Sequence, residues 1–410
     1  MVAILAMPMR PITETISLEQ ARGLMLDSAT PILRTETILV RDAYGRVVAT
    51  SGVAKMDVPP FDRAAMDGYA VIAEDTFGAG SYQPRTLRCV EKVYTGQVPV
   101  RRIVPGECSE IATGAPMPEG ADAVVMVEET ERGAADEVRV LTPVYPRQHV
   151  GRRAADIAVG QNVLNPGDVL TPSRIGALAA TGIVEVEVYA RPRVGILSTG
   201  NEIVAPGQPL APGQIYDINQ FTLSAVIGAH GGIPVVYPTA ADTIDDLTAA
   251  VEATAGEDLV VFSGGSSVGE RDLIMDVLHR LGDVMFHGIA VKPGKPTVFG
   301  RIGGRPVLGM PGYPTSCLSN AYMLLIPMLR RMARLNEYQP RSIQLPLARR
   351  IVSTTGRHQF YTVRVVDGAA VPAFKASGDI TSMSQADGYI EIPAQTDIVE
   401  AGEVVEVRLF

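Results

Sequence analysis

A segment rich in glycine and serine follows a short apolar run at residues 259–262 and precedes a helical pattern that begins at Glu270. A strand that ends in such a turn at a helix N-terminus presents backbone N–H groups and hydroxyls, which favour an anion. Two adjacent glycines let the backbone approach a phosphate without a Cβ in the way. The alternative is a tight turn that binds nothing. The residues that we predict to contact the ligand are Ser263, Gly264, Gly265, Ser266, Ser267 and Gly269.

Three carboxylates accompany this loop. Glu202 ends the segment Ser198-Thr199-Gly200-Asn201, Asp242 precedes a helical pattern at 243–254, and Asp272 closes the glycine-serine loop. Carboxylate oxygens are the ligands that Mg²⁺ prefers, and they would repel an anionic substrate unless a cation lay between. We therefore predict that Glu202, Asp242 and Asp272 bind Mg²⁺, and that Ser198, Thr199 and Gly200 contact the substrate. Asp242 also fits a simple helix N-cap.

Two lysines, Lys292 and Lys295, lie on a loop in which a proline follows each of them. Ammonium groups held on a rigid loop suit a tetrahedral oxyanion. Ordinary surface lysines are the alternative, although such lysines are rarely placed between prolines. The chain contains neither a Walker A sequence nor G-x-G-x-x-G, which disfavours P-loop and Rossmann nucleotide binding.

The structural elements that position these groups are expected between residues 191 and 334, where strand patterns alternate with helix patterns. This alternation predicts a mostly parallel α/β sheet with helices on both faces, and ligands in such sheets bind beyond the carboxyl ends of the strands. The predicted strands are 194–197, 233–236, 259–262, 297–299 and 306–308, and the predicted helices are 218–230, 243–254, 270–281 and 315–334.

The rest of the chain reads as β structure and short helices. Ser17 and Gln20 form a capping-box pattern before a helix at 18–27. Alternating apolar runs separated by glycine and proline predict a β-rich module at 57–150 and a small C-terminal β domain at 335–410. The segments 12–56 and 151–190 bracket the module and are predicted to form one discontinuous linker domain. The expected fold class is thus multidomain α/β plus β.

The amino-acid composition disfavours several classes of protein. The 410 residues are 46% hydrophobic and 20% charged, as in a globular protein, and a net charge of −9 disfavours a nucleic-acid surface. The three cysteines share no ligand-like spacing and are predicted to be reduced thiols of a cytoplasmic protein. The apolar run at the N-terminus is too short for a signal peptide, and no stretch is long enough to span a membrane.

Several blocks, in order from about residue 12 to the C-terminus, resemble the molybdopterin molybdenumtransferase family, which includes MoeA and the gephyrin E domain. In the first part of the chain they are Phe61-Asp-Arg-Ala-Ala-Met-Asp-Gly-Tyr-Ala, Ala112-Thr-Gly-Ala-Pro-Met-Pro-Glu-Gly-Ala-Asp and Gly151-Arg-Arg-Ala-Ala-Asp-Ile. In the predicted sheet domain they are Ser198-Thr-Gly-Asn-Glu, Gly213-Gln-Ile-Tyr-Asp-Ile-Asn, Ser263 to Asp272, Lys292-Pro-Gly-Lys-Pro and Pro311-Gly-Tyr-Pro.

The resemblance implies an enzyme that inserts molybdenum from molybdate into adenylylated molybdopterin, with Mg²⁺-dependent release of AMP. It also implies four subdomains and a homodimer whose site joins the sheet domain of one subunit to the β-rich module of the other. Two other functions stay open. One is a molybdopterin adenylyltransferase, whose relatives lack the flanking domains, and the other is a molybdopterin-binding scaffold without catalysis, against which the retained carboxylates count. A separate adenylyltransferase partner is also left open.

Carried over by motif, the catalytic positions are Asp67, Thr113, Asp156, Glu202, Asp242 and Asp272, and Pro311, Gly312 and Pro314 shape the pocket. The oxyanion positions are Lys292, Lys295, Ser316, Arg357 and Ser382. Taken alone, Asp67 fits a turn residue before Gly68, and Asp156 fits a salt-bridge partner of the neighbouring arginines.

Three positions depart from the family pattern. Ser266 stands where valine is common, Tyr313 replaces the usual asparagine, and Thr362 occupies a position that is usually basic. The Tyr313 variant is typical of archaeal-looking members, in which tungstate is a second candidate substrate. The sequence leaves molybdate and tungstate as alternatives.

Overall fold

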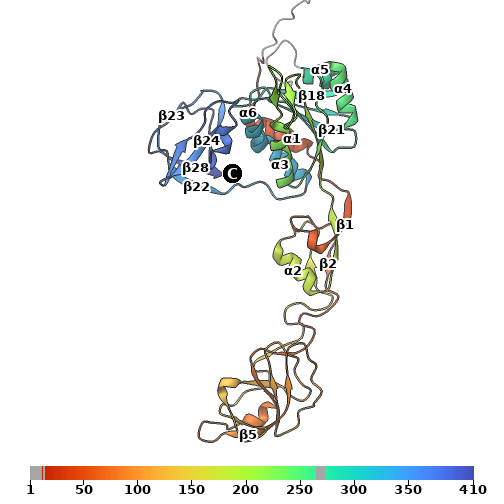
Figure 1. The fold of residues 1–410 in the computed structure, drawn as a ribbon, viewed down its shortest axis with the longest axis vertical. Coiled ribbons are helices and arrows are strands. Elements are labelled where there is room, and N and C mark those ends of the chain that lie inside the picture. The colour runs from red at the N-terminus through yellow and green to blue at the C-terminus, as the bar shows by residue number, and fades with distance from the viewer. Residues whose placement is uncertain (1–11, 13, 265–272) are drawn as a thin grey trace, which may run out of the picture. The chain divides into compact units, whose positions relative to one another are not determined.

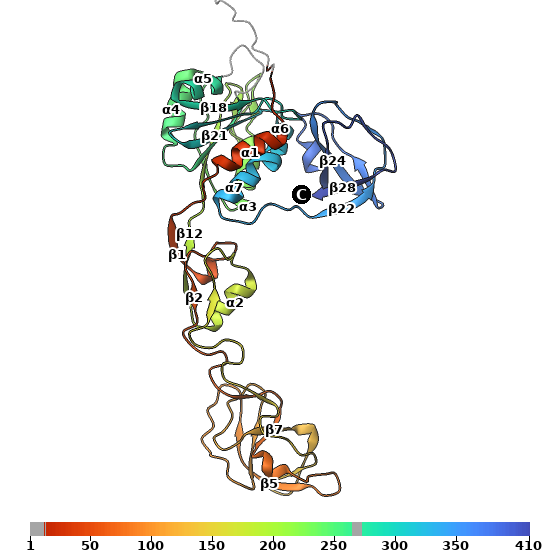
Figure 2. The same ribbon diagram turned by 180° about the vertical axis from the view of Figure 1, so that it is seen from behind.

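The computed structural model describes residue 12 and residues 14–264 and 273–410, and the chain divides into two compact units (Figures 1 and 2). Unit 1 comprises Met1–Glu36 and Tyr189–Phe410, and unit 2 comprises Thr37–Val188. Five residues predicted to bind substrate or metal lie outside the described residues: Gly265, Ser266, Ser267, Gly269 and Asp272.

Unit 1 contains a six-stranded sheet in the order β16-β13-β17-β21-β20-β18. The first four strands are parallel, which confirms the mostly parallel sheet predicted from the alternation of strands and helices. Two details differ, because β20 runs antiparallel to β21 and an additional antiparallel strand, β18, follows the helix after β17. The strands are β13 (Arg193–Ser198), β16 (Ile233–Val236), β17 (Leu259–Ser263), β18 (Gly282–His287), β20 (Val298–Ile302) and β21 (Arg305–Met310).

Helices cover both faces of this sheet, and the strands alternate accordingly. On β17, Leu259 and Val261 belong to one buried cluster, whereas Val260 and Phe262 belong to another. This period of two is what a strand buried on both faces requires. The helices are α1 (Leu18–Ser28), α3 (Asn219–Ala229), α4 (Ile244–Ala253), α5 (Leu273–Leu281), α6 (Pro314–Asn320), the π-helical turn η4 (Ala321–Leu325) and α7 (Ile326–Met332). The predicted capping box of α1 is present.

A second sheet of unit 1, in the order β19-β24-β26-β28-β22, forms the C-terminal β region. Its first strand, β19 (Val291–Lys292), comes from the lysine loop and pairs in parallel with β24, so that Lys292 lies beside Gln359. The pairing joins the predicted oxyanion loop to the C-terminal region. The other strands are β22 (Ser342–Pro346), β24 (His358–Val366), β25 (Ala369–Pro372), β26 (Gly388–Ile392) and β28 (Val404–Leu409), and a short helix, α8, spans Thr381–Ser384.

Unit 2 is built around a six-stranded sheet in the order β7-β4-β6-β5-β9-β8. Its strands are β4 (Gly68–Val71), β5 (Arg85–Val93), β6 (Glu107–Ile111), β7 (Ala123–Met126), β8 (Thr130–Arg132) and β9 (Glu137–Val140). A separate hydrophobic core is formed by residues of the segments 40–48 and 164–188, which include the helix α2 (Pro172–Ala180). Among the described residues, no helix combines the length and the apolar character that crossing a membrane requires.

Candidate active site

The carboxyl ends of the central parallel strands lie in register. Ser198 of β13 pairs with Ser263 of β17, which in turn pairs with Met310 of β21. The Thr199 N–H donates to the Ser263 carbonyl at 3.1 Å, and the Gly264 N–H donates to the Met310 carbonyl at 3.3 Å. The predicted substrate segments at 198–200, 263–264 and 311–314 therefore meet at one edge of the sheet.

Four buried side chains at this edge have a polar atom without a hydrogen-bond partner among the described residues: Ser198 Oγ, Thr199 Oγ1, Asp217 Oδ2 and Asn219 Oδ1. Each of these residues is at most 6% exposed. A buried polar atom without a partner costs about 1–3 kcal/mol, so such atoms are rare in folded proteins. Because four of them lie on neighbouring segments, this edge of the sheet is a candidate ligand site.

Asp217 and Asn219 were not among the predicted site residues. Asn219 Nδ2 donates to Ser263 Oγ at 2.7 Å and to the Gly312 carbonyl at 2.8 Å, which ties α3 to two of the predicted segments. Asp217 Oδ1 accepts from the Gln220 N–H at 2.9 Å, and its other oxygen stays unpaired. The block 213–219 was quoted for the family resemblance, and this was the signal that pointed to both residues.

Two glycines are required by the backbone at this edge. Gly264 has a φ of +101°, and a Cβ there would lie 2.5 Å from the Thr199 carbonyl oxygen. Gly200 has a φ of +138°, and a Cβ there would lie 2.7 Å from Glu202 Oε2. Any other residue would be strained at both positions. The second contact also places the Glu202 carboxylate against the turn at Gly200.

The two described carboxylates of the predicted Mg²⁺ site lie on neighbouring segments. Thr199 and Ala240 form a parallel bridge, and Glu202 and Asp242 follow these residues. Asp242 is half-buried, and it is not the cap of α4. The N-cap is Thr243, whose hydroxyl accepts from the Asp246 N–H at 3.1 Å, so the alternative role of Asp242 as an N-cap is wrong.

The donor chemistry fits Mg²⁺. This ion commonly binds through one or two carboxylates and keeps several water ligands. Glu202 is exposed and Asp242 half-exposed, which leaves room for those waters. Within the described residues no group of three His, Cys, Asp or Glu side chains is suited to hold a metal ion, and Asp272 lies outside them.

Among the described residues, the ammonium group of each lysine of the predicted oxyanion site makes one hydrogen bond. Lys292 Nζ donates to Thr354 Oγ1 at 2.8 Å, and Lys295 Nζ donates to the Ile12 carbonyl at 2.8 Å. The Arg357 N–H bonds the Thr354 carbonyl at 3.3 Å, so Lys292 and Arg357 meet at the same turn. An ammonium group has three donors, so each lysine retains two for an anion.

A fully buried amide holds the lysine loop. Asn320, at the end of α6, donates through Nδ2 to the Gly294 carbonyl at 3.0 Å and to Thr297 Oγ1 at 2.6 Å. Gly294 has a φ of +108°, and a Cβ there would lie 2.3 Å from Asn320 Oδ1. The loop between Lys292 and Lys295 is therefore fixed to the helix that starts at Pro314.

A second group of predicted residues lies in unit 2. The Thr113 N–H and hydroxyl donate to Asp67 Oδ1 at 2.7 and 2.9 Å. Both bonds lower the pKa of Asp67 below its ordinary value, and the backbone bond has the larger effect. A Cβ on Gly68 would lie 1.9 Å from the Val125 carbonyl oxygen of the adjacent strand, so close strand packing requires the glycine after Asp67. The functional role of Asp67 stays a prediction.

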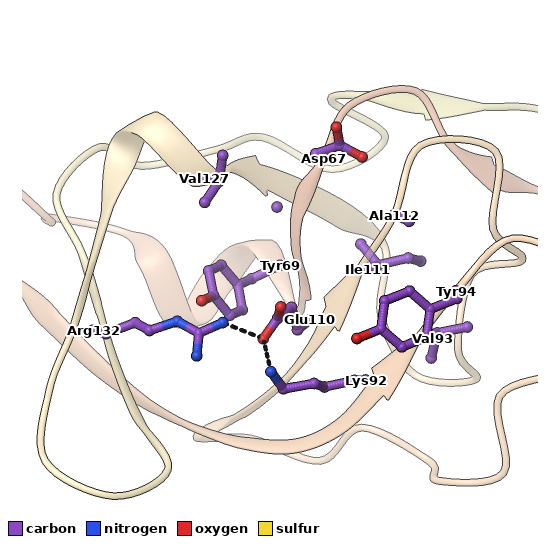
Figure 3. A pocket seen from close by; sticks show the side chains of 11 residues that line it. Asp67, Tyr69, Lys92, Val93, Tyr94, Glu110, Ile111, Ala112, Val127 and Arg132 are labelled. Carbon is purple, nitrogen blue, oxygen red and sulfur yellow. Dashed lines mark hydrogen bonds and ion pairs between the residues drawn. The ribbon is translucent and has the colours of Figure 1, made fainter.

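Asp67 borders a cavity of about 190 Å³ in unit 2 (Figure 3). Glu110 projects into it from β6 and forms ion pairs with Lys92 Nζ at 3.0 Å and with Arg132 at 2.6 Å. The third predicted residue of this unit, Asp156, is exposed. Its neighbour Arg153 forms an ion pair with Asp57 at 2.5 Å.

Models of known protein families match most of the chain. Residues 16–182 match the MoeA N-terminal region (domain I and II), residues 195–331 a probable molybdopterin binding domain, and residues 344–410 the MoeA C-terminal region (domain IV). Molybdopterin molybdenumtransferase 2 of Mycobacterium tuberculosis is 35% identical over 386 residues, which cover 91% of this chain and 95% of the relative. The molybdopterin molybdenumtransferase of Haemophilus influenzae is 32% identical, with 96% and 98% covered.

Two solved structures of MoeA proteins from Pyrococcus horikoshii give TM-scores of 0.83 and 0.82 at 40% and 32% identity, and each match covers 97% of this chain. The same two matches cover 99% and 100% of the Pyrococcus horikoshii chains. The chain belongs to the MoeA family of molybdopterin molybdenumtransferases. The family resemblance, the fold class and the prediction of a transferase of molybdenum cofactor synthesis are thereby confirmed.

The positions at which this MoeA chain departs from the family pattern have distinct surroundings. Tyr313 is 66% exposed and immediately precedes α6, whereas Thr362 is fully buried in β24. A basic side chain at position 362 would have to be accommodated inside the C-terminal β region, and this chain avoids that charge. Ser266, the third departure, lies outside the described residues.

The two serines predicted to bind the oxyanion are both buried, at 4% exposure for Ser316 and 0% for Ser382. Their segments adjoin, because the Thr315 N–H bonds the Ser377 carbonyl at 3.1 Å and Thr315 Oγ1 donates to the Asp379 carbonyl at 2.9 Å. The Ser382 hydroxyl accepts from the Lys375 N–H at 3.0 Å. This bond shapes the loop around Ser382 and leaves its oxyanion role a proposal.

Proposed function

We propose that this MoeA-family chain inserts molybdenum, taken from molybdate or tungstate, into adenylylated molybdopterin with Mg²⁺-dependent release of AMP. The observation that carries the proposal is the group of four unpaired buried polar atoms where the strand ends meet. No described protein group satisfies them, and their chemistry matches a polar heterocycle joined to phosphate.

The unpaired atoms suit the pterin part of the substrate. A pterin ring carries amino and ring N–H donors together with carbonyl and ring-nitrogen acceptors. Asp217 Oδ2 and Asn219 Oδ1 are acceptors for the N–H groups, and the Ser198 hydroxyl is a donor for a ring acceptor. A ligand that lacked these groups would leave the protein atoms unpaired, which is how a buried polar site achieves selectivity.

The turns beside these atoms suit phosphate. Gly200 and Gly264, both with positive φ, allow tight turns directly after the strand ends, and anions bind beyond the carboxyl ends of the strands in sheets of this kind. Glu202 and Asp242 would hold Mg²⁺ between the protein and the phosphates. When bound, Mg²⁺ would neutralise charge on the departing AMP.

The oxyanion is proposed to bind at the lysine loop. Lys292 and Lys295 each retain two donors, and the Arg357 backbone lies at the turn that anchors Lys292. Charge-assisted hydrogen bonds to an anion contribute about 1.5–3 kcal/mol each. Because Asn320 fixes the loop, the donors are held in place before the anion arrives.

The flanking regions favour metal insertion over the alternative of molybdopterin adenylylation. The adenylyltransferase hypothesis needs only the sheet domain, whereas this chain also carries the MoeA N-terminal and C-terminal regions. We also propose that the working enzyme is a homodimer, in which Asp67 and Thr113 of one subunit complete the site of the other. A separate adenylyltransferase would supply the substrate.

The test is incubation of the purified chain with adenylylated molybdopterin, Mg²⁺ and either molybdate or tungstate, with AMP as the readout. We expect AMP to appear only when both Mg²⁺ and an oxyanion are present, and the preferred oxyanion identifies the metal. AMP formation from ATP and molybdopterin would instead indicate adenylyl transfer chemistry. Tight substrate binding with no AMP under any condition would identify a scaffold.

A further inference from the structure

Two of the three cysteines face each other in unit 2. Cys89 on β5 and Cys108 on β6 are directly paired in the sheet, whereas Cys317 lies buried in unit 1. Both thiols contribute to the same buried cluster, so their side chains lie on one face. Neighbouring strands are about 4.7–4.9 Å apart, which falls within the Cα separation of about 4.4–6.8 Å that a disulfide spans.

The two thiols have unequal surroundings. Cys89 is half-buried, whereas Cys108 is 0% exposed. The Cys89 thiol lies 3.5 Å from the Glu91 carbonyl oxygen, within hydrogen-bond distance. The adjacent Cys108 thiol, opposed by burial, lowers the pKa of Cys89 to about 6. The proximity of the Cys89 thiol raises the pKa of Cys108. The greater exposure of Cys89, together with the opposite directions of the two pKa shifts, favours Cys89 as the sulfur that reacts first.

The strand geometry around Cys89 is irregular. The register of β5 against β6 shifts between Cys89 and Glu91, which leaves Val90 without a partner residue. A bulge of this kind bends a strand locally, and such bulges occur most often at sheet edges and beside functional sites. The Cys89 N–H bonds the Asp136 carbonyl at 2.7 Å, so the backbone beside the thiol is held although the ladder is interrupted.

The pair lies outside the machinery proposed for metal insertion. Along the same face, the next row of the sheet contains Glu110 and Lys92, which border the cavity near Asp67. Neither cysteine lines that cavity. The nucleophilic thiols thus have no role in the proposed reaction.

We propose that Cys89 and Cys108 form a two-thiol modification site that reacts with a small disulfide. The Cys89 thiolate attacks one sulfur of the disulfide, forms a mixed disulfide and releases the first thiolate. Cys108 then transfers its proton to the released thiolate, attacks the Cys89 sulfur and displaces the second thiolate, which takes a proton from water. One disulfide is reduced to two thiols, and the two cysteines are oxidised to one cross-strand disulfide.

The test uses the full-length reduced protein and 2-hydroxyethyl disulfide. We expect the count of free thiols to fall from three to one, and peptide mapping without reductant to link the peptide of Cys89 to that of Cys108. Dithiothreitol should restore all three thiols. If mapping of the folded wild-type protein finds no such link while the unfolded protein forms it, the proposal is overturned.

Variants separate the two steps. Cys108→Ser should stop the reaction at a stable mixed disulfide on Cys89, and Cys89→Ser should leave Cys108 unmodified while the protein stays folded. Cys317→Ser is the matched control and should still form the link. Modification of Cys317 as fast as Cys89 would show general thiol reactivity and would also overturn the proposal.

Discussion

At the scale of single residues, the site depends on hydrogen bonds that the sequence did not reveal. Asp67 and Thr113 were both predicted from their motifs, but 45 residues of intervening sequence gave no sign that one accepts two hydrogen bonds from the other. Asp217 and Asn219 lie in the family block 213–219, but the sequence did not show that their side chains have unpaired atoms at the strand ends.

The first prediction concerns Thr113→Val. The change removes the hydroxyl bond to Asp67 and keeps the backbone bond, so the pKa of Asp67 should rise toward its ordinary value. A group whose folded pKa is depressed is protonated only at lower pH. The acid limb of the AMP-release profile should therefore move to higher pH in the variant, and Thr113→Ser should retain the wild-type profile. An unchanged acid limb would mean that ionised Asp67 is not required.

The second prediction concerns Lys295→Ala. Loss of one charge-assisted hydrogen bond of about 1.5–3 kcal/mol should weaken molybdate or tungstate binding by roughly 10–150-fold. AMP binding should stay near normal in calorimetry. Lys375→Ala is the control, because the ammonium group of that exposed lysine bonds only Thr381 among the described residues, and the variant keeps the backbone N–H bond of residue 375 to Ser382. Equal losses of oxyanion and nucleotide affinity would rule out a specific oxyanion role.

The third prediction concerns Asp242→Ala, which should abolish Mg²⁺-dependent AMP release. Ligand binding without Mg²⁺ should survive, since a repelling carboxylate has been removed. Thr243→Ala is the matched control: it removes the observed N-cap of α4 and should cost about 0.5–2 kcal/mol of stability without changing Mg²⁺ dependence. Full activity of Asp242→Ala at ordinary Mg²⁺ would exclude it as a metal ligand.

At the scale of elements, local patterns predicted much of the sheet. Strands predicted at 194–197 and 259–262 appear as β13 and β17, and both end at their predicted binding residues. Pairing partners were harder to predict. No sequence pattern predicted β18, which begins directly after α5 without a turn, and none predicted β19, which pairs with a strand more than 60 residues later. Periodicity describes a strand's own faces but carries no information about its neighbour.

The cysteines illustrate the same limit. Sequence spacing gave Cys89 and Cys108 no relation, because 18 residues separate them and metal-binding or redox motifs use shorter intervals. Their pairing follows from the parallel register of β5 and β6. Parallel strands are joined by long connections, so residues that face each other are necessarily distant in sequence.

The fourth prediction concerns Asn320→Leu, which removes the amide that holds the lysine loop. Leaving the Gly294 carbonyl short of a donor should cost about 1–3 kcal/mol of stability. If the amide positions the lysines, the KM for the oxyanion should also rise while AMP affinity stays unchanged. Ser319→Ala, a buried change on the same helix, is the control. A loss of stability without any rise in KM would limit Asn320 to a structural role.

At the scale of the molecule, the proposed catalytic residues are divided between the two units. Unit 2 carries Asp67 and Thr113, and unit 1 carries the strand ends and the lysine loop. In the homodimer proposed above, these groups would come from different subunits. A C₂ assembly would then contain two equivalent sites, each built from both chains.

The fifth prediction tests this division by subunit mixing. Asp67→Asn and Asp272→Asn should each be inactive as homodimers. A mixed dimer contains one site with both changes and one site with neither, so mixing should restore part of the activity. Exchange is followed with two affinity tags. Proven exchange without any recovery would place each site within a single chain.

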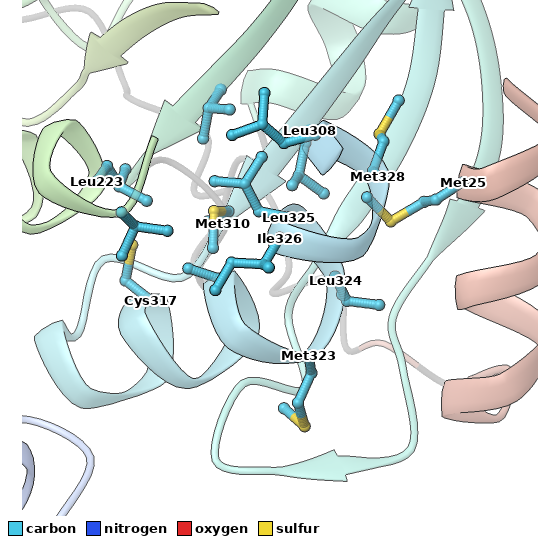
Figure 4. Close-up of a cluster of buried hydrophobic side chains, with 14 of the residues drawn as sticks. Met25, Leu223, Leu308, Met310, Cys317, Met323, Leu324, Leu325, Ile326 and Met328 are labelled. Atoms are coloured by element: carbon cyan, nitrogen blue, oxygen red, sulfur yellow. The ribbon is translucent and has the colours of Figure 1, made fainter. Parts of the chain in front are cut away.

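The position of α1 has a consequence for how the protein is made. Leu18, Ala21 and Met25 pack in the same core as Met328 and Leu329, and Met25 lies beside Met328 in Figure 4. During translation, α1 is therefore synthesised about 300 residues before the residues that it packs against in that core. An isolated helix of 11 residues is marginal in water, so α1 should stay unfolded during this time, with its apolar side chains exposed. Unit 2 is contiguous and completes its own contacts meanwhile, so a chaperone that shields apolar segments should meet this protein first at its N-terminal helix.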